Sequence, residues 1–449
     1  MPQTTTYVDV PSSPSPRPEA TARLDASRYT SPEFMQREWR DMWSRTWLLA
    51  GMELDLKAPG DFFVFTVGPE SILVTRTRAG GISAVYNVCQ HRGNRLLTEE
   101  RGCLKAIVCP YHGWSYDLDG HLRAVPDANR FSQGLDRDAL SLKPLKVEAW
   151  AGFIWVNMDL DAAPLAEFLG PIPAQLAPYH FERMVLVEDQ TVTLDANWKT
   201  AIDNFNEQYH VDFLHPQHAS FVDCCNAVNQ LWPHGHRSVK VEGFVVNPRY
   251  PIPDTLPALL RAAIALLDLD PAEFDGRVPA LREAVQRRKR AVGLRLGYDY
   301  SEFSDDQLSD VWQYDLFPNV IMTVQAEELW VMRPRPHATD PNRCLFDKWT
   351  FRTLPNHDAT GLDAIPGAQP VNKDVARRPE HQVFTQDELL AGQYTMNITI
   401  DQDVRLLRQM QAGMHSRGFS QAFLNDDESR VQHFHDWLDI SLRRGEMSS

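Results

Sequence analysis

The chain has 449 residues, 43% hydrophobic and 23% charged, which is the composition of a folded globular protein with two or three domains. Its formal net charge of −15 argues against nucleic acid as a partner, because phosphate binding needs clustered lysines and arginines. The N-terminus lacks the pattern of a secretory signal, and apolar runs stay well below the roughly 20 residues that cross a bilayer. We therefore expect a cytoplasmic protein without nucleic-acid or membrane partners, in which some of the six cysteines bind metal.

The N-terminal part of the chain contains a predicted tail and a predicted helix. The first 20 residues are rich in Pro, Ser and Thr, and we expect a disordered tail over residues 1–30. Ser31-Pro32-Glu33 then supplies a helix start, and aromatic residues follow at roughly helical spacing: Phe34, Trp39, Trp43 and Trp47. This pattern predicts a helix within residues 31–58, packed on the larger domain.

Two further domains follow from the change in periodicity along the chain. Short β-rich runs separated by Gly, Pro and Asp predict a small all-β domain over residues 59–160. From residue 161 to 449, helical segments alternate with long strands, notably between Asn319 and Leu354, which we expect to be antiparallel. The fold class is therefore α+β, with a small all-β domain and a larger α+β domain.

Two motifs in the β-rich region each combine a cysteine with a histidine. Cys89 and His91 form C-x-H, and after 17 residues Cys109 and His112 form C-x-x-H. Two thiolates and two imidazoles can bind zinc in a mixed site. One Cys and one His from each loop suit instead a [2Fe-2S] cluster with two Cys on one iron and two His on the other. Cys103, between the loops, is expected to be a small buried thiol.

These four residues resemble the signature of the Rieske non-haem iron oxygenases, large (alpha) subunit. The surrounding residues agree, since Arg92-Gly93 follows the first histidine and Gly113-Trp114 follows the second. The resemblance implies a Rieske [2Fe-2S] cluster bound by Cys89, His91, Cys109 and His112.

A second group of candidate ligands lies in the larger domain. Glu207 precedes His210 by one helical turn, so on a helix both would share one face, and His215 could join them after a turn. Taken singly, each histidine would more often be structural. Two histidines and a carboxylate together can form a facial triad that leaves open positions on iron.

The residues around this group also resemble the catalytic domain of the Rieske oxygenases. Asn197-Trp198-Lys199 precedes it, and Asn204 and Tyr209 lie within it. Family members usually have Asp at the position of Glu207, and that acid bridges an iron-binding histidine to a cluster histidine of the neighbouring subunit. The resemblance implies that Glu207 couples His210 to His112 and that Asn204 belongs to the catalytic pocket. Members that act on quaternary amines share the Glu, which weakens the expectation of ring dihydroxylation.

The third iron ligand is expected from a helix near the C-terminus. The family places an Asp at the start of such a helix, and the segment ITIDQDVRLLRQMQAGM fits this pattern. We predict Asp403 as the ligand, with Asp401 as the second choice. The alternative is that both acids only cap the helix and complement its dipole.

The resemblance implies a fold and a function for the whole chain. The larger domain would have an antiparallel sheet with helices of the helix-grip type. The protein would be a terminal oxygenase with a Rieske cluster, a mononuclear Fe(II) and O2 as cosubstrate, taking electrons from a reductase or ferredoxin to hydroxylate a small organic substrate in aromatic catabolism. The alternatives are a monooxygenase that performs O- or N-dealkylation or amine hydroxylation, and a Rieske electron carrier fused to a ligand-binding domain. A homotrimer is implied, with a small beta subunit as an option.

Overall fold

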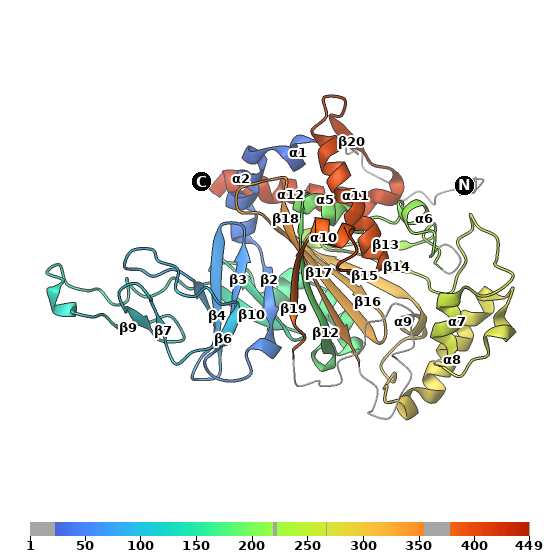
Figure 1. Ribbon diagram of the computed structural model, residues 1–449, viewed down its shortest axis with the longest axis horizontal. Coiled ribbons are helices and arrows are strands. Elements are labelled where there is room, and N and C mark those ends of the chain that lie inside the picture. Colours follow the sequence, from blue (N-terminus) through green and yellow to red (C-terminus); the bar gives the residue numbers. More distant parts are fainter. Residues whose placement is uncertain (1–22, 219–221, 266, 354–377, 449) are drawn as a thin grey trace. The chain divides into compact units, whose positions relative to one another are not determined.

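The computed structural model describes residues 23–218, 222–265, 267–353 and 378–448, which form two compact units (Figure 1). Most of one unit is Met35–Gly170, and most of the other is Pro171–Arg335 with Pro341–Asp439. Residues 1–22 of the predicted tail lie outside the described residues. The prediction is wrong for residues 23–30, because they form β1 (Arg23–Asp25) and α1 (Ser27–Thr30), in which Leu24 and Tyr29 are buried.

The predicted N-terminal helix is present but shorter than its aromatic spacing suggests. Helix α2 spans Pro32–Asp41, and the Ser31 hydroxyl caps it by accepting from the Phe34 N–H at 3.0 Å. Trp43 lies in a 3₁₀ turn, Trp43–Arg45, and Trp47 follows it as a buried residue. These two aromatic residues have the spacing of an α-helix and are buried, but neither of them lies in an α-helix.

The Met35–Gly170 unit is built from three small sheets, as expected of an all-β domain. A four-stranded sheet has the order β5-β4-β3-β6, and two three-stranded sheets have the orders β10-β11-β2 and β7-β8-β9. The strands are β2 (Leu48–Met52), β3 (Asp61–Val67), β4 (Glu70–Arg76), β5 (Ile82–Tyr86), β6 (Arg101–Cys103), β7 (Ile107–Val108), β8 (Ser115–Tyr116), β9 (Leu122–Ala124), β10 (Lys146–Trp150) and β11 (Phe153–Asn157). One short helix, α3 (Leu165–Leu169), follows them. Cys89 and Cys109 belong to the buried core of this unit together with Leu73, Ile107 and Tyr116.

The other unit is organised around one large sheet of eight strands, in the order β13-β14-β15-β16-β17-β18-β12-β19. The strands are β12 (Val185–Leu194), β13 (Val228–Leu231), β14 (Arg237–Val241), β15 (Val311–Leu316), β16 (Val320–Val324), β17 (Glu328–Pro336), β18 (Cys344–Arg352) and β19 (His381–Thr385). Pairing is antiparallel from β13 to β17 and between β12 and β18, whereas β12 and β19 are parallel. The antiparallel strands predicted between Asn319 and Leu354 are β16, β17 and β18.

Helices cover this sheet and carry the residues of interest. Helix α5 (Trp198–Phe205) packs against β18, α11 (Ile398–Met414) packs against β12, and the two helices also pack against each other (Figure 1). Further helices of the unit are α4 (Ile172–Leu176), α6 (Val211–Leu214), α7 (Ala258–Ala265), α8 (Val278–Leu296), α9 (Asp305–Ser309) and α10 (Gln386–Leu390), together with α12 (Ser429–Ser448) up to Asp439. Among the described residues, no helix combines the length and the apolar character that crossing a membrane requires.

Candidate metal centres

The two Cys/His loops of the β-rich unit have the same backbone hydrogen bonds. The Cys89 N–H donates to the Asn94 carbonyl at 2.8 Å, and the Gly93 N–H donates to the Cys89 carbonyl at 3.0 Å. The second loop repeats this pattern: the Cys109 N–H donates to the Trp114 carbonyl at 2.8 Å, and the Gly113 N–H donates to the Cys109 carbonyl at 3.1 Å. Gly93 and Gly113 have φ of 74° and 69°, which favours glycine at both turns.

The thiols of these loops lie inside the unit, and the imidazoles lie nearer its surface. Cys89 and Cys109 are each only 2% exposed, and burial, with the neighbouring Cys109 thiol, raises the pKa of Cys89. The rings of His91 and His112 are partly exposed, and their centroids are 4.6 Å apart. The two thiols are therefore neighbours, and so are the two imidazoles. A [2Fe-2S] cluster with two Cys on one iron and two His on the other requires this arrangement.

Two further observations test whether these residues fit a cluster. Nδ1 of His91 is buried and has no hydrogen-bond partner among the described residues, so its lone pair is free for a metal. The Tyr116 hydroxyl lies 3.4 Å from the Cys89 sulfur and accepts from the Gln90 N–H at 3.1 Å, which leaves its proton available to the sulfur.

Cys103 is exposed on β6, so the expectation that it is a buried thiol is wrong.

In the larger unit, the segment that carries Glu207, His210 and His215 is not one continuous helix. Helix α5 ends at Phe205, residues 206–210 form turns, and the single-turn helix α6 begins at Val211. His210 and His215 are the residues that flank α6. The prediction that Glu207 and His210 share one face of a helix is therefore wrong. The Glu207 carboxylate still reaches His210, because the turn between them folds it back onto the imidazole.

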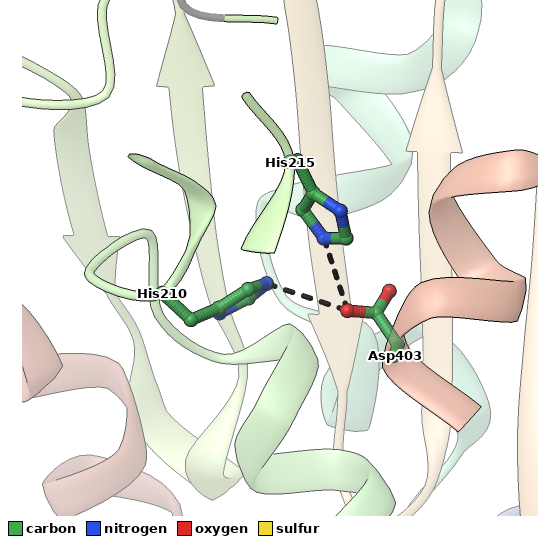
Figure 2. A group of neighbouring side chains, drawn as sticks. All are labelled: His210, His215 and Asp403. Carbon is green, nitrogen blue, oxygen red and sulfur yellow. Dashed lines mark hydrogen bonds and ion pairs between the residues drawn. The ribbon is translucent and has the colours of Figure 1, made fainter. Parts of the chain in front are cut away.

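His210, His215 and Asp403 form a compact group of potential metal ligands (Figure 2). One potential ligand atom from each lies within 4.8 Å of the others. Nε2 of His215 is 3.0 Å and Nε2 of His210 is 3.5 Å from Oδ1 of Asp403, which reaches them from α11. The side chains of His215 and Asp403 are only 3% and 2% exposed. Two imidazoles and one carboxylate whose ligand atoms lie this close together are the donor set of a facial triad for iron.

Each imidazole of this group is held at its other nitrogen. Nδ1 of His210 lies 2.5 Å from Oε1 of Glu207, whose Oε2 accepts from the His210 backbone N–H at 3.0 Å. Burial opposes charge on His210, but Glu207 and Asp403 outweigh it and raise the pKa of this imidazole. Nδ1 of His215 lies 2.7 Å from Oε1 of Gln402, a contact that sequence reasoning missed. The only signal in the sequence was that Gln402 directly precedes the candidate ligand Asp403.

The remaining candidates, Asp401 and Asn204, stand apart from this group. Asp401 lies in the first turn of α11, where its carboxylate accepts from the Thr395 hydroxyl at 2.5 Å and the Met396 N–H at 2.8 Å. It therefore complements the dipole at the helix start, as the alternative predicts, but the N-cap of α11 is Asn397, whose side chain accepts from the Ile400 N–H at 3.0 Å. Asn204 lies in α5 with Nδ2 buried, and within the described part of the chain its side chain makes no hydrogen bond to the three residues.

We expect Asp403→Ala to lose the mononuclear iron and Asp401→Ala to keep it. Asp403 supplies the carboxylate of the compact group, whereas the carboxylate of Asp401 accepts a hydrogen bond from the Met396 N–H just before the helix. Iron analysis per chain after purification measures the difference, with the cluster absorption as the internal reference. Iron loss in Asp401→Ala with retention in Asp403→Ala would reverse the assignment.

Comparison with known proteins shows the family to which the chain belongs. Residues 181–443 match the ring hydroxylating alpha subunit (catalytic domain) family, and residues 46–145 match the Rieske [2Fe-2S] domain family. The chain therefore belongs to the Rieske oxygenases, as their large oxygenase subunit. Members of this family use a Rieske cluster, a mononuclear iron and O2, and the residues described above fit both metals.

Amine monooxygenases and an aromatic dioxygenase are among the relatives similar to this chain. The chain is 25% identical to the glycine betaine monooxygenase oxygenase subunit of Pseudomonas aeruginosa over 91% of this chain and 86% of that one. It is 34% identical to the subunit of the same name from Chromohalobacter salexigens, but over only 42% of either chain. It is 35% identical to the large oxygenase component of the naphthalene 1,2-dioxygenase system of Pseudomonas putida, over 41% of this chain and 42% of that one.

A solved structure shares the fold. It is a quaternary ammonium Rieske monooxygenase in complex with L-carnitine, with a TM-score of 0.64 and 20% identity over 95% of this chain and 99% of that one. The α+β fold class predicted from the sequence is thereby confirmed.

Proposed function

We propose that the protein is a terminal oxygenase that uses O2 and electrons from a reductase or ferredoxin to monooxygenate a small amine, with loss of an N-alkyl group. The observation that carries the oxygenase function is the buried group of two imidazoles and one carboxylate. Glu207, in place of the usual Asp, and the match to glycine betaine monooxygenase over nearly the whole chain support the amine. Hydroxylation of an aromatic substrate is the second candidate, supported by the shorter match to the naphthalene enzyme.

The proposed roles follow from what each side chain contacts. Cys89, His91, Cys109 and His112 would hold the cluster, and His210, His215 and Asp403 would hold the iron. When bound, the cluster supplies electrons and the iron supplies O2 activation. Glu207 fixes the His210 ring through Nδ1, so that its Nε2 points toward Asp403. Asn204 remains a candidate for substrate contact because its buried Nδ2 has no partner among the described residues.

The assembly and the domain limits are also part of the proposal. We place the cluster in residues 59–160, the iron in residues 161–449, and the enzyme in the cytoplasm as a homotrimer, with a small beta subunit as an option. Aromatic side chains beside the candidate sites support an assembly that covers them: Tyr209 and Phe213 are 45% and 63% exposed next to His210, and Tyr111 is 55% exposed next to His112.

We expect O2-dependent release of an aldehyde from glycine betaine or carnitine, because hydroxylation of a carbon bonded to nitrogen gives a product that expels the amine. The assay supplies a reductase and NADH, traps the aldehyde and compares it with O2 uptake. Discrimination against naphthalene should be about 10⁴-fold in kcat/KM, since a site built to pair with the polar groups of one substrate leaves its own polar groups unpaired with the other. A diol from naphthalene without aldehyde from any amine would establish the second candidate instead.

A further inference from the structure

The two histidines of the candidate iron site have different partners at Nδ1. His210 faces the charged carboxylate of Glu207, whereas His215 faces the neutral amide of Gln402. Gln402 directly precedes Asp403 in α11, so one turn of this helix supplies both the carboxylate of the group and the acceptor for His215. An imidazole can offer its Nε2 lone pair to a metal only when its proton is on Nδ1, and that proton needs an acceptor.

A second glutamine orients the amide of Gln402. Nε2 of Gln217 donates to Oε1 of Gln402 at 2.8 Å, and Nε2 of Gln402 donates back to Oε1 of Gln217 at 3.5 Å. If Gln402 alone were turned, its NH2 group would face both the NH2 group of Gln217 and Nδ1 of His215. The imidazole proton would then move to Nε2, where it blocks metal binding. The pair therefore keeps an oxygen toward His215 unless both amides turn together.

The neutral partner also matters for the charge of the site. Glu207 and Asp403 already supply two negative charges close to the group. A carboxylate in place of Gln402 would add a third. An amide accepts the Nδ1 proton without adding charge, so the ring is oriented and no negative charge is added to those of Glu207 and Asp403.

We propose that Gln402 is a positioning residue of the iron site, supported by Gln217, and that the two amides hold His215 in the Nδ1–H tautomer with its Nε2 turned toward the metal. This inference rests on the proposed function in that it takes His215 as an iron ligand. It assigns no contact between either glutamine and substrate or O2.

The test measures metal affinity in the full-length protein that carries its cluster and has been stripped of mononuclear iron. Fe(II) is titrated anaerobically into the parent and into Gln402→Leu, Gln402→Glu, Gln217→Leu and Gln411→Leu. Gln411 is a matched control because it is a buried glutamine on the same helix, but it accepts from the Asn197 backbone N–H at 2.9 Å and not from a histidine. The EPR spectrum of the Co(II)-loaded protein reports the ligand geometry independently of turnover.

Gln402→Leu should weaken Fe(II) binding about 10- to 100-fold, the usual loss when the partner of a metal-bound histidine is removed. Gln217→Leu should cause a smaller loss. Gln402→Glu should bind Fe(II) at least as tightly as the parent, because it keeps an acceptor, but with an altered Co(II) spectrum because it adds a charge. Gln411→Leu should lower the thermal midpoint without changing the affinity.

Equal loss of affinity in Gln402→Leu and Gln402→Glu would overturn the proposal, because Glu keeps both the shape and an acceptor for Nδ1 of His215, so its loss would show that this acceptor does not set the affinity. Unchanged affinity in Gln402→Leu would overturn it as well. If Gln402→Leu does not fold, the Gln217→Leu variant tests the proposal instead. An Fe(II) affinity of Gln217→Leu equal to that of the parent would then contradict the proposed role of the two glutamines. A protein that binds Fe(II) in this Gln402-dependent way but oxidises no amine would overturn the proposed substrate and leave this inference standing.

Discussion

Glu207→Gln is expected to reduce steady-state turnover about 100-fold, the upper end of the effect of mutating the partner of a metal-bound histidine, while both metals stay bound. Glutamine keeps the size of the side chain and can still accept the Nδ1 proton of His210, which lies 2.5 Å from Oε1 of Glu207. It removes the negative charge that compensates the imidazole. Iron content, cluster EPR and substrate-dependent O2 uptake of the same preparation measure the effect.

Glu428→Gln is the matched control for this variant. Glu428 lies close enough to Glu207 that burial, with the nearby carboxylates of Glu207 and Asp203, raises its pKa to about 7. Its side chain accepts from the Asn425 N–H at 2.7 Å, within the cap of a 3₁₀ turn. If turnover depends on the specific partner of His210, Glu428→Gln should stay within a few-fold of the parent.

A single-turnover experiment separates the possible roles of Glu207. Protein reduced at both centres, with substrate bound, is mixed with O2, and the EPR signal of the reduced cluster should persist much longer in Glu207→Gln than in the parent. Fast loss of that signal with a normal yield of product would show that electrons reach the iron by another route. A variant without mononuclear iron would identify Glu207 as a ligand.

Replacing Cys109 or His112 with alanine should abolish the cluster. Cys109 is 2% exposed, so no water can substitute for its thiolate without opening the core, and three protein ligands cannot complete two iron sites. The brown absorption and the Rieske EPR signal should both disappear. Cys103→Ala removes an exposed thiol from the same unit and should keep both signals. A Rieske EPR signal in either ligand variant would refute the assignment.

Much of the β-rich unit could be predicted because its chemistry is local. The run DFFVFTV is β3, from Asp61 to Val67, and each Cys/His pair lies within one loop. Ligand spacing inside a loop of a few residues is visible in the sequence, since the loop itself brings the donors together. The short helix α2 also began where its Ser-Pro-Glu motif placed it.

The iron site could be predicted only in part, because its geometry depends on contacts between distant residues. The break between Phe205 and Val211 has no Pro or Gly to mark it, so a continuous helix was the natural expectation. Asp401 and Asp403 look alike in sequence, and only their contacts in the fold separate them: Asp401 accepts from the Met396 N–H, whereas Asp403 reaches His210 and His215. The contact of His215 with Gln402 joins residues 187 positions apart, which no local pattern encodes.

The presence of one cysteine and one histidine in each cluster loop has a consequence for the stability of this unit. Each loop offers one thiolate and one imidazole, so an iron held by Cys89 and Cys109 and an iron held by His91 and His112 would each be tied to both loops. The cluster would then act as a crosslink, and neither loop could leave without breaking bonds to both irons. Holding two separate loops together restricts the unfolded chain more than closing either loop alone. Oxidative loss of the cluster would therefore remove a structural clamp along with an electron carrier, and the loops would be the first part of this unit to open.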